Sequence, residues 1–238
     1  MKTNMTGQTL KIIGFLMTYP EDDRIDAAEE ISTHLGREAW LSEKKRTRLD
    51  EFLAGMKDSD LLDLQEEYVM LFDRTPSLSL HLFEHVHGDS RDRGQAMVDL
   101  DTLYREIGLE NMSEHTPDFL PLFLEYLSLL PVEQAQENLD GAIDVVAAIG
   151  ERLKKRQSRY AVLFDALQEA ARVKPDEKKL QAAMNMDSGK IPDNAAMDAA
   201  WEEQFALATP EVGKSGCHRA EDMLARMMVP DEKTEARS

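Results

Sequence analysis

The sequence is poor in several residue types on which whole classes of proteins depend. It has a single cysteine, Cys217, among 238 residues, which excludes a disulfide framework within the chain and a four-cysteine zinc or iron–sulfur site. Lysine and arginine number 28 against 46 aspartate and glutamate residues, and the formal net charge is −18. Such a surface repels phosphate backbones, so no nucleic acid is expected as a partner. It favours a basic peptide or a basic protein segment instead.

Long apolar runs are also missing. The first apolar stretch, from Leu10 to Met17, is too short to cross a bilayer and lacks the small-residue cleavage site of a signal peptide. No other run approaches the roughly 18 apolar residues that a membrane helix needs. We therefore expect a cytoplasmic protein with no direct membrane insertion.

Helical periodicity is the pattern that the chain does show. Apolar residues recur at three- and four-residue steps, and prolines and glycines mostly lie between the periodic segments. The alternation typical of strands is hard to find. The pattern predicts an all-α protein: a single helical-bundle domain of roughly ten helices over residues 1–208, with a flexible acidic tail over 209–238.

The helix boundaries can be predicted from caps, prolines and glycines. We expect helices over residues 7–18, after Pro20, from Ser42, from Asp58 or Ser59, from Pro76 through Val86, from Asp89 or Ser90 to Gly108, and over 118–130, 132–157, 158–173 and 194–207.

The densest group of ionisable and turn-forming residues lies between Leu82 and Leu100. Gly88 suits the C-terminal turn of one helix and Asp89 or Ser90 can cap the next, which predicts a tight corner between two helices. Arg91 and Arg93 stand at a helix start, where the helix dipole disfavours cations. We therefore expect these arginines to have fixed acidic partners among Glu84, Asp89 and Asp92.

The same corner offers an alternative chemistry. His85 and His87 are two residues apart and would point about 200° apart on a regular helix, so they could not hold one metal ion from such a helix. At a helix end the turn could realign them with Glu84 and Asp89. A metal-dependent enzyme that uses His85, His87 and nearby carboxylates is thus the alternative to a recognition site. Surface or capping histidines are the more ordinary interpretation.

Several motifs resemble one known family. The run from Phe83 to Leu100, FEHVHGDSRDRGQAMVDL, closely resembles the signature of the NarJ family, the assembly chaperones of respiratory nitrate reductase, also called its delta subunit. Similar agreement is found in Tyr68–Arg74, in Pro117–Leu127, in Ser158–Asp165 and in Trp201-Glu202-Glu203. The resemblance covers about Ile12 to Phe205 in order, whereas the last thirty or so residues, including Cys217, match no pattern.

The resemblance implies an all-helical fold of the molybdoenzyme-chaperone type, no catalysis and no cofactor of its own. It implies that the partner is the apo catalytic (alpha) subunit of nitrate reductase, recognised in part by a basic and apolar N-terminal peptide. The chaperone would enable insertion of the molybdenum cofactor and the iron–sulfur cluster before membrane attachment. It would not be part of the mature enzyme.

A candidate peptide site follows from the corner and the family motif together. We expect acidic side chains of the corner to pair with cations of the peptide, because an acidic body attracts a basic segment and a groove can bury its apolar face. The helix that contains Tyr126 is expected to supply an apolar floor. The candidate residues are Glu84, His85, His87, Gly88, Asp89, Arg91, Asp92, Arg93, Leu120, Phe123 and Tyr126.

Overall fold

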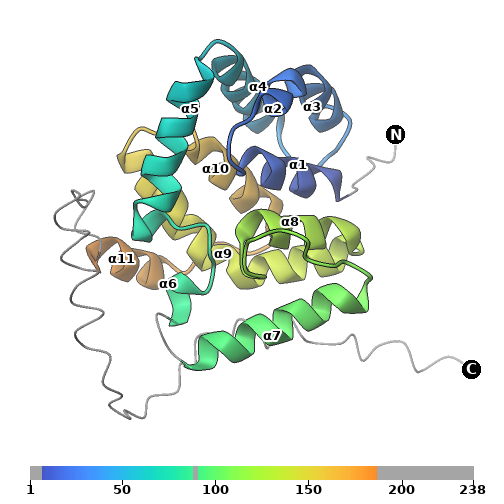
Figure 1. The fold of residues 1–238 in the computed structure, drawn as a ribbon, viewed down its shortest axis with the longest axis vertical. Helices are drawn as coiled ribbons and strands as arrows, with labels where there is room; N and C mark the ends of the chain where they lie inside the picture. Colours follow the sequence, from blue (N-terminus) through green and yellow to red (C-terminus); the bar gives the residue numbers. More distant parts are fainter. Residues whose placement is uncertain (1–6, 88–90, 187–238) are drawn as a thin grey trace, which may run out of the picture.

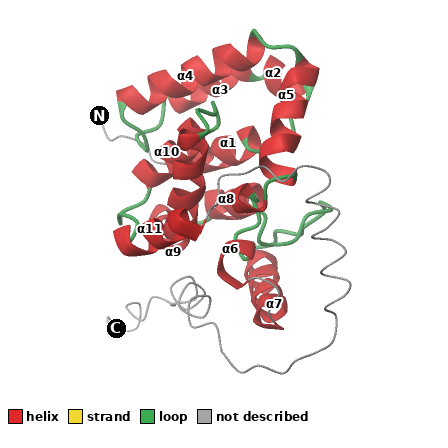
Figure 2. Ribbon diagram, turned by 90° about the vertical axis from the view of Figure 1, so that its left-hand side faces the viewer, coloured by secondary structure: helices red, strands yellow, loops and turns green. Residues whose placement is uncertain are grey.

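The computed structural model describes residues 7–87 and 91–186, and every structural statement below concerns these residues. All regular elements in this part of the chain are helical, which confirms the predicted all-α fold (Figures 1 and 2). Extended backbone pairs there at one isolated bridge, between His81 and Phe119. The predicted helix over 194–207 and the predicted tail over 209–238 lie outside the described residues.

The helices follow one another with short connections. In chain order they are α1 (Gln8–Leu16), α2 (Asp22–Asp26), α3 (Ala28–Leu35), α4 (Glu43–Lys57), α5 (Leu61–Tyr68), the π-helical turn η1 (Val69–Asp73), the 3₁₀ turn η2 (Pro76–Leu78), α6 (Glu84–His87), α7 (Arg91–Glu106), α8 (Leu120–Leu129), α9 (Val132–Lys155), α10 (Ala161–Ala170) and α11 (Glu177–Met186).

The centre of the core is formed by α8, α9 and α10. Helix α8 packs against both α1 and α9, and α10 packs against both α9 and α4. Phe123, Leu127 and Phe164 on these helices have no exposed surface. Figures 1 and 2 place α3 and α4 at one end of the molecule and α6 and α7 at the other.

Two glycines let α1 approach α8 closely. A Cβ atom at Gly7 would lie 2.1 Å from the carbonyl oxygen of Ser128, and one at Gly14 would lie 3.0 Å from that of Pro121. Backbone atoms cannot move aside as the end of a side chain can. A side chain at Gly7 would therefore clash with α8, and one at Gly14 would need α8 to shift by a few tenths of an ångström.

A buried carboxylate links α10 to two neighbouring helices. Asp165 accepts contacts from Arg48 Nη1 at 2.9 Å, Lys45 Nζ at 3.3 Å and Lys154 Nζ at 2.6 Å. Burial acts to raise the pKa of Asp165, but these cations, Lys154 first, outweigh it and hold the pKa below its ordinary 3.8. Three elements that are distant in sequence thus meet at one charge.

The predicted helix from Pro76 through Val86 is wrong. Only the turn η2 and the short α6 are helical there, because the chain between them pairs with the segment before α8. Leu82 N–H donates to the Asp118 carbonyl at 3.0 Å, and Leu120 N–H donates to the Leu80 carbonyl at 2.8 Å. Backbone groups used in this way are lost to a helix.

Two further boundaries differ from the prediction. The helix expected after Pro20 is broken at Ala27 into α2 and α3, and α11 was not expected at all. Helix α11 is capped by Asp176, whose carboxylate accepts from the N–H groups of Lys178 and Lys179. No helix in the described part of the chain is long and apolar enough to cross a membrane.

Candidate functional site

The Glu84–Arg93 corner joins α6 to α7, at the far end of the molecule from α4 (Figure 1). Arg93 Nη2 donates to Glu84 Oε1 at 3.1 Å, with side-chain exposures of 23% and 37%. The prediction that an arginine of the corner has a fixed acidic partner is thus confirmed for Arg93. The ion pair connects the two helices across residues 88–90, which lie outside the described residues.

His85 points into the body of the protein. Its Nε2 lies 2.8 Å from the Ser79 carbonyl oxygen, which can only accept, so the imidazole donates from Nε2. Burial lowers the pKa of His85 below its ordinary 6.5, and nearby Arg152 lowers it further against the opposing effect of the hydrogen bond. A neutral His85 therefore fastens α6 to the chain that follows η2.

The other members of the corner belong to α6, to α7 or to the residues between them. His87 is the last residue of α6, and Arg91 and Asp92 begin α7, whereas Gly88 and Asp89 lie outside the described residues. Among the residues that the structure does describe, no group of three or more histidine, cysteine or acidic side chains is arranged to hold a metal ion. The Nε2 atom of His85 is hydrogen-bonded to the Ser79 carbonyl and is therefore not free to bind a metal ion.

A second buried carboxylate, Asp118, holds the start of the corner in place. Its Oδ2 accepts from the Phe83 N–H at 3.1 Å, and its Oδ1 accepts from the Thr116 hydroxyl at 2.5 Å. The Asp118 side chain has no exposed surface. Because Phe83 precedes Glu84 directly, this carboxylate fixes the backbone from which the corner begins.

His81 completes the environment of Asp118. Its Nδ1 lies 2.9 Å from Thr116 Oγ1 and 3.4 Å from Asp118 Oδ1. Since the Thr116 proton goes to Asp118, the Nδ1 proton of His81 is shared between the threonine oxygen and Asp118 Oδ1. Burial acts to raise the pKa of Asp118, but the hydrogen bonds from His81, Thr116 and Phe83 outweigh it and hold the pKa below its ordinary 3.8.

His115 extends this cluster toward the surface. Its ring stacks on the ring of Phe119 with a centroid distance of 3.8 Å, and it lies 6.0 Å from the ring of His81. Burial and the neighbouring His81 lower the pKa of His115. Sequence reasoning missed His81, Thr116 and Asp118 as site residues, because Thr116-Pro117 also has the form of a helix start. A hydroxyl two residues before an acid was the only local signal.

The expected floor residues lie on α8. Leu120 and Phe123 have no exposed surface, and Tyr126 is 5% exposed. The centroid of the Tyr126 ring lies 4.8 Å from that of the Tyr104 ring on α7. In this structure the three residues belong to the buried core, and Tyr126 links α8 to α7 through Tyr104. Their direct contact with a peptide stays a prediction that requires neighbouring elements to move aside.

The comparisons with known proteins give the family. The family model described as "Nitrate reductase delta subunit" matches residues 39–166, which is more than half of the chain. The chain belongs to this family. Its match includes the Glu84–Arg93 corner, the Asp118 cluster and most of α10.

Curated relatives agree over nearly the same span. The nitrate reductase molybdenum cofactor assembly chaperone NarJ of Escherichia coli (strain K12) is 42% identical over 195 residues, which are 82% of each chain. The probable chaperone NarW of the same strain is 40% identical over 197 residues, 83% of this chain and 82% of NarW. A probable NarJ of Bacillus subtilis (strain 168) is 30% identical over 104 residues, 44% of this chain and 56% of that protein.

Family membership removes the enzymatic interpretation of the corner, whereas its role as a peptide-binding site stays a prediction. The family consists of chaperones for assembly of the nitrate reductase molybdenum cofactor, not of catalysts. The alternative of a metal-dependent enzyme that uses His85 and His87 is therefore dropped.

Proposed function

We propose that this protein binds the apo catalytic subunit of a respiratory nitrate reductase in the cytoplasm and keeps it competent for insertion of the molybdenum cofactor and the iron–sulfur cluster. It leaves before the enzyme attaches to the membrane. The observation that carries the proposal is the 42% identity to a molybdenum cofactor assembly chaperone over 82% of both chains. An agreement of this extent includes the core and the corner together.

We propose that the recognition site is the Glu84–Arg93 corner. Its acids would pair with cations of the basic, apolar N-terminal peptide of the client, because complementary charge speeds encounter and fixes register. Glu84 supports this role, since it is 37% exposed and rests on a helix end fixed by His85 and Asp118. The proposed contact residues are Glu84, His85, His87, Gly88, Asp89, Arg91, Asp92 and Arg93, with Leu120, Phe123 and Tyr126 on α8 below.

Calorimetric titration with a synthetic peptide of the reductase N-terminus tests the site. We expect a variant with alanine at Glu84, Asp89 and Asp92 to bind about tenfold more weakly than the wild type, a change of about 1.4 kcal/mol. The matched control carries alanine at Asp26, Glu29 and Glu30, three exposed acids near the start of α3. Both variants raise the net charge by three, so a general electrostatic effect would weaken both equally and contradict the corner.

A permanent structural subunit is the outcome that would contradict the transient role. Quantitative analysis of active reductase purified from membranes distinguishes the two. We expect the chaperone to be absent from the mature enzyme and to be recovered with the cofactor-free catalytic subunit. Stoichiometric chaperone in the active membrane complex would overturn the proposal.

A further inference from the structure

Arg152, near the end of α9, is a buried arginine that joins three separate elements. Its Nη1 donates to the Ser77 carbonyl of η2 at 3.0 Å, and its Nη2 donates to the Ala183 carbonyl of α11 at 3.0 Å. The planar guanidinium holds its donors in a fixed fork, so one side chain can satisfy carbonyls on two different elements at once. Arg152 therefore fastens η2 and α11 to the same point of α9.

The η2 end of this link leads directly to the Glu84–Arg93 corner. Ser77 is two residues before Ser79, whose carbonyl accepts from His85 Nε2 at 2.8 Å, and His85 lies on α6, the first helix of the corner. Burial is the main cause that lowers the pKa of His85, and the nearby positive charge of Arg152 adds to it. A displacement of η2 would therefore reach α6 through a two-residue step of the chain and one hydrogen bond.

Helix α11 is bound to α9 through polar contacts. Lys179 Nζ donates to Asp144 Oδ2 at 2.8 Å, and the Asp176 N–H donates to Asp144 Oδ1 at 2.8 Å. The described side chains of α11 are exposed or half-buried, whereas Phe123 and Phe164 in the core have no exposed surface. A helix of ten residues is not stable by itself and depends on such contacts. Release of α11 from α9 should therefore cost much less free energy than unfolding of the core.

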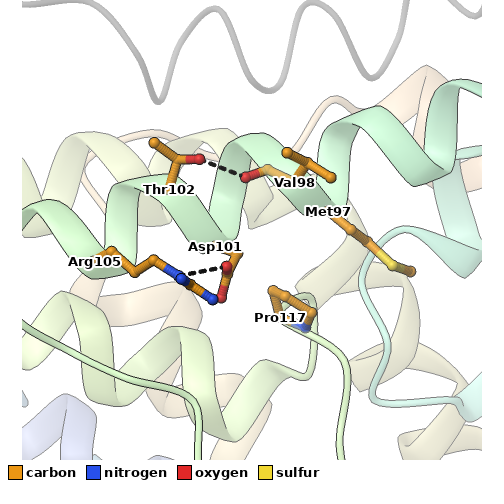
Figure 3. A pocket seen from close by; sticks show the side chains of 6 residues that line it. All are labelled: Met97, Val98, Asp101, Thr102, Arg105 and Pro117. Atoms are coloured by element: carbon orange, nitrogen blue, oxygen red, sulfur yellow. Dashed lines mark hydrogen bonds and ion pairs between the residues drawn. The ribbon is translucent and has the colours of Figure 1, made fainter.

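The other helix of the corner, α7, has supports that do not involve α11. The Tyr104 hydroxyl donates to the Pro117 carbonyl at 2.8 Å. On the exposed face of α7, Arg105 Nε donates to the Asp101 carboxylate at 2.8 Å within the same helix (Figure 3). The second half of α7 is therefore an internal reference, because it lies at the same end of the molecule and these contacts do not depend on Arg152.

We infer that Arg152 is a positioning residue that couples the docking of α11 to the order of the corner. When α11 leaves α9, Arg152 loses the Ala183 carbonyl and its guanidinium becomes open to water. A guanidinium that can turn to water no longer holds the Ser77 carbonyl firmly, so η2 and α6 loosen with α11. Such a coupling is reciprocal, so a disturbed corner should loosen α11 by the same factor. The family match includes Ser77 and Arg152 but ends before α11, so a segment beyond the matched span influences residues within it.

The test releases α11 without changing the corner. Lys179→Glu replaces the ion pair with Asp144 by a repulsion, and hydrogen exchange followed by NMR reports on single amides. The N–H groups of Leu78 in η2 and Val86 in α6 are both hydrogen-bonded in the native protein, and we expect them to exchange at least about fivefold faster in the variant. Exchange in the second half of α7 should change less than about twofold.

Lys57→Glu is the matched control. It makes the same change of charge and breaks the ion pair of Lys57 with Glu29, between α4 and α3. Because neither residue takes part in the link to the corner, exchange at Leu78 and Val86 should stay within about twofold of the wild type.

A second variant acts on the link itself. Arg152→Lys keeps the charge, but a compact ammonium lacks the fork that reaches both carbonyls. We expect the N–H groups of Leu78, Val86 and Leu180, the last bonded to the Asp176 carbonyl in α11, to exchange faster together. His85→Ala tests the reciprocal direction and should speed exchange at Leu180.

The outcomes separate this coupling from the proposed function. Wild-type exchange at Leu78 and Val86 in both Lys179→Glu and Arg152→Lys would overturn the inference. An equal increase in the second half of α7 would also overturn it, because that pattern reports a general loss of stability.

The consequence for the client rests on the proposed function. In calorimetric titration, Lys179→Glu should weaken binding of the reductase N-terminal peptide about threefold, although the variant is more acidic and general attraction of a basic peptide would rise. Lys57→Glu, with the same charge, should not weaken it. Failure of the wild type to bind the peptide or the apo subunit would overturn the proposed function and leave the coupling standing, because hydrogen exchange measures it without the client.

Discussion

Asp118 and Asp165 are both buried carboxylates, yet the protein satisfies them in opposite ways. Asp118 receives a backbone N–H and a hydroxyl, with His81 close by, from the loops around the candidate site. Asp165 receives Lys45, Arg48 and Lys154 from two helices of the core. Donors fixed in a backbone cannot leave when their acceptor is removed, whereas long cationic side chains can turn to water. We therefore expect the removal of each carboxylate to lower the free energy of unfolding by a different amount and with a different dependence on salt.

Removal of Asp118 should have the largest effect on stability. We expect Asp118→Ala to lower the free energy of unfolding by about 3 kcal/mol, because the Phe83 N–H and the Thr116 hydroxyl lose a buried acceptor. Urea denaturation at pH 7 measures the loss. Asp118→Asn keeps the shape and one acceptor, so it should lose less than the alanine variant. A loss below 1 kcal/mol for Asp118→Ala would show that the loops reorganise.

Removal of Asp165 should cost less and should depend on salt. We expect Asp165→Ala to lower the free energy of unfolding by about 1–2 kcal/mol, because its partners are 22–45% exposed and can become hydrated. In 1 M NaCl, where the Debye length is about 3 Å, the loss should shrink. The loss in Asp118→Ala should stay the same. An equal salt response in both variants would break the comparison.

The smallest expected effect is a pH dependence of stability that arises from the histidines in the part of the molecule around Asp118. The pKa of His85 is lowered in the folded protein, so the unfolded chain takes up a proton first and stability falls as the pH drops below about 6.5. His115 acts in the same direction. We expect His85→Gln to show a smaller loss of stability between pH 7.5 and 5.5 than the wild type does.

A measurement at pH 8 separates titration from structure. Glutamine can still donate to the Ser79 carbonyl, so any difference at pH 8 reports a change in packing or hydrogen bonding rather than protonation. An unchanged pH dependence in His85→Gln would contradict the assignment. Hydrogen exchange should show acid-induced opening at α6 before α10, because the groups that contact Asp165 are lysines and an arginine.

Much of the fold could be predicted from local patterns. Ser42 caps α4 as expected, since its hydroxyl accepts from Lys45 N–H, and the helices α8, α9 and α10 lie within their predicted ranges. Pro131 separates α8 from α9, as a proline at that place should. Capping residues and prolines act within a few residues of themselves, so a sequence displays them directly.

The failures come from contacts between distant residues. The apolar spacing of Leu78, Leu82 and Val86 suits a helix, but backbone pairing with Asp118 and Leu120 prevents one. Helix α11 has few strongly apolar residues and gains support from Lys179, which donates to Asp144 on α9 at 2.8 Å. Such contacts override local preference, and no short window of sequence contains both partners.

The candidate site shows the same division. The need of Arg93 for an acidic partner followed from the helix dipole, and Glu84 lies only nine residues away. The cluster of His81 with Asp118 joins residues 37 positions apart and had no comparable signal.

The glycines of α1 bear on how a mutational screen for client binding should be interpreted. Any larger residue at Gly7 would strike the main chain of α8, and one at Gly14 would crowd it, in both cases far from the corner. Such variants would score as defective in nitrate reductase assembly simply because little intact chaperone survives in the cell. If the cellular amount of each variant chaperone is measured together with its phenotype, these positions will not be mistaken for client contacts.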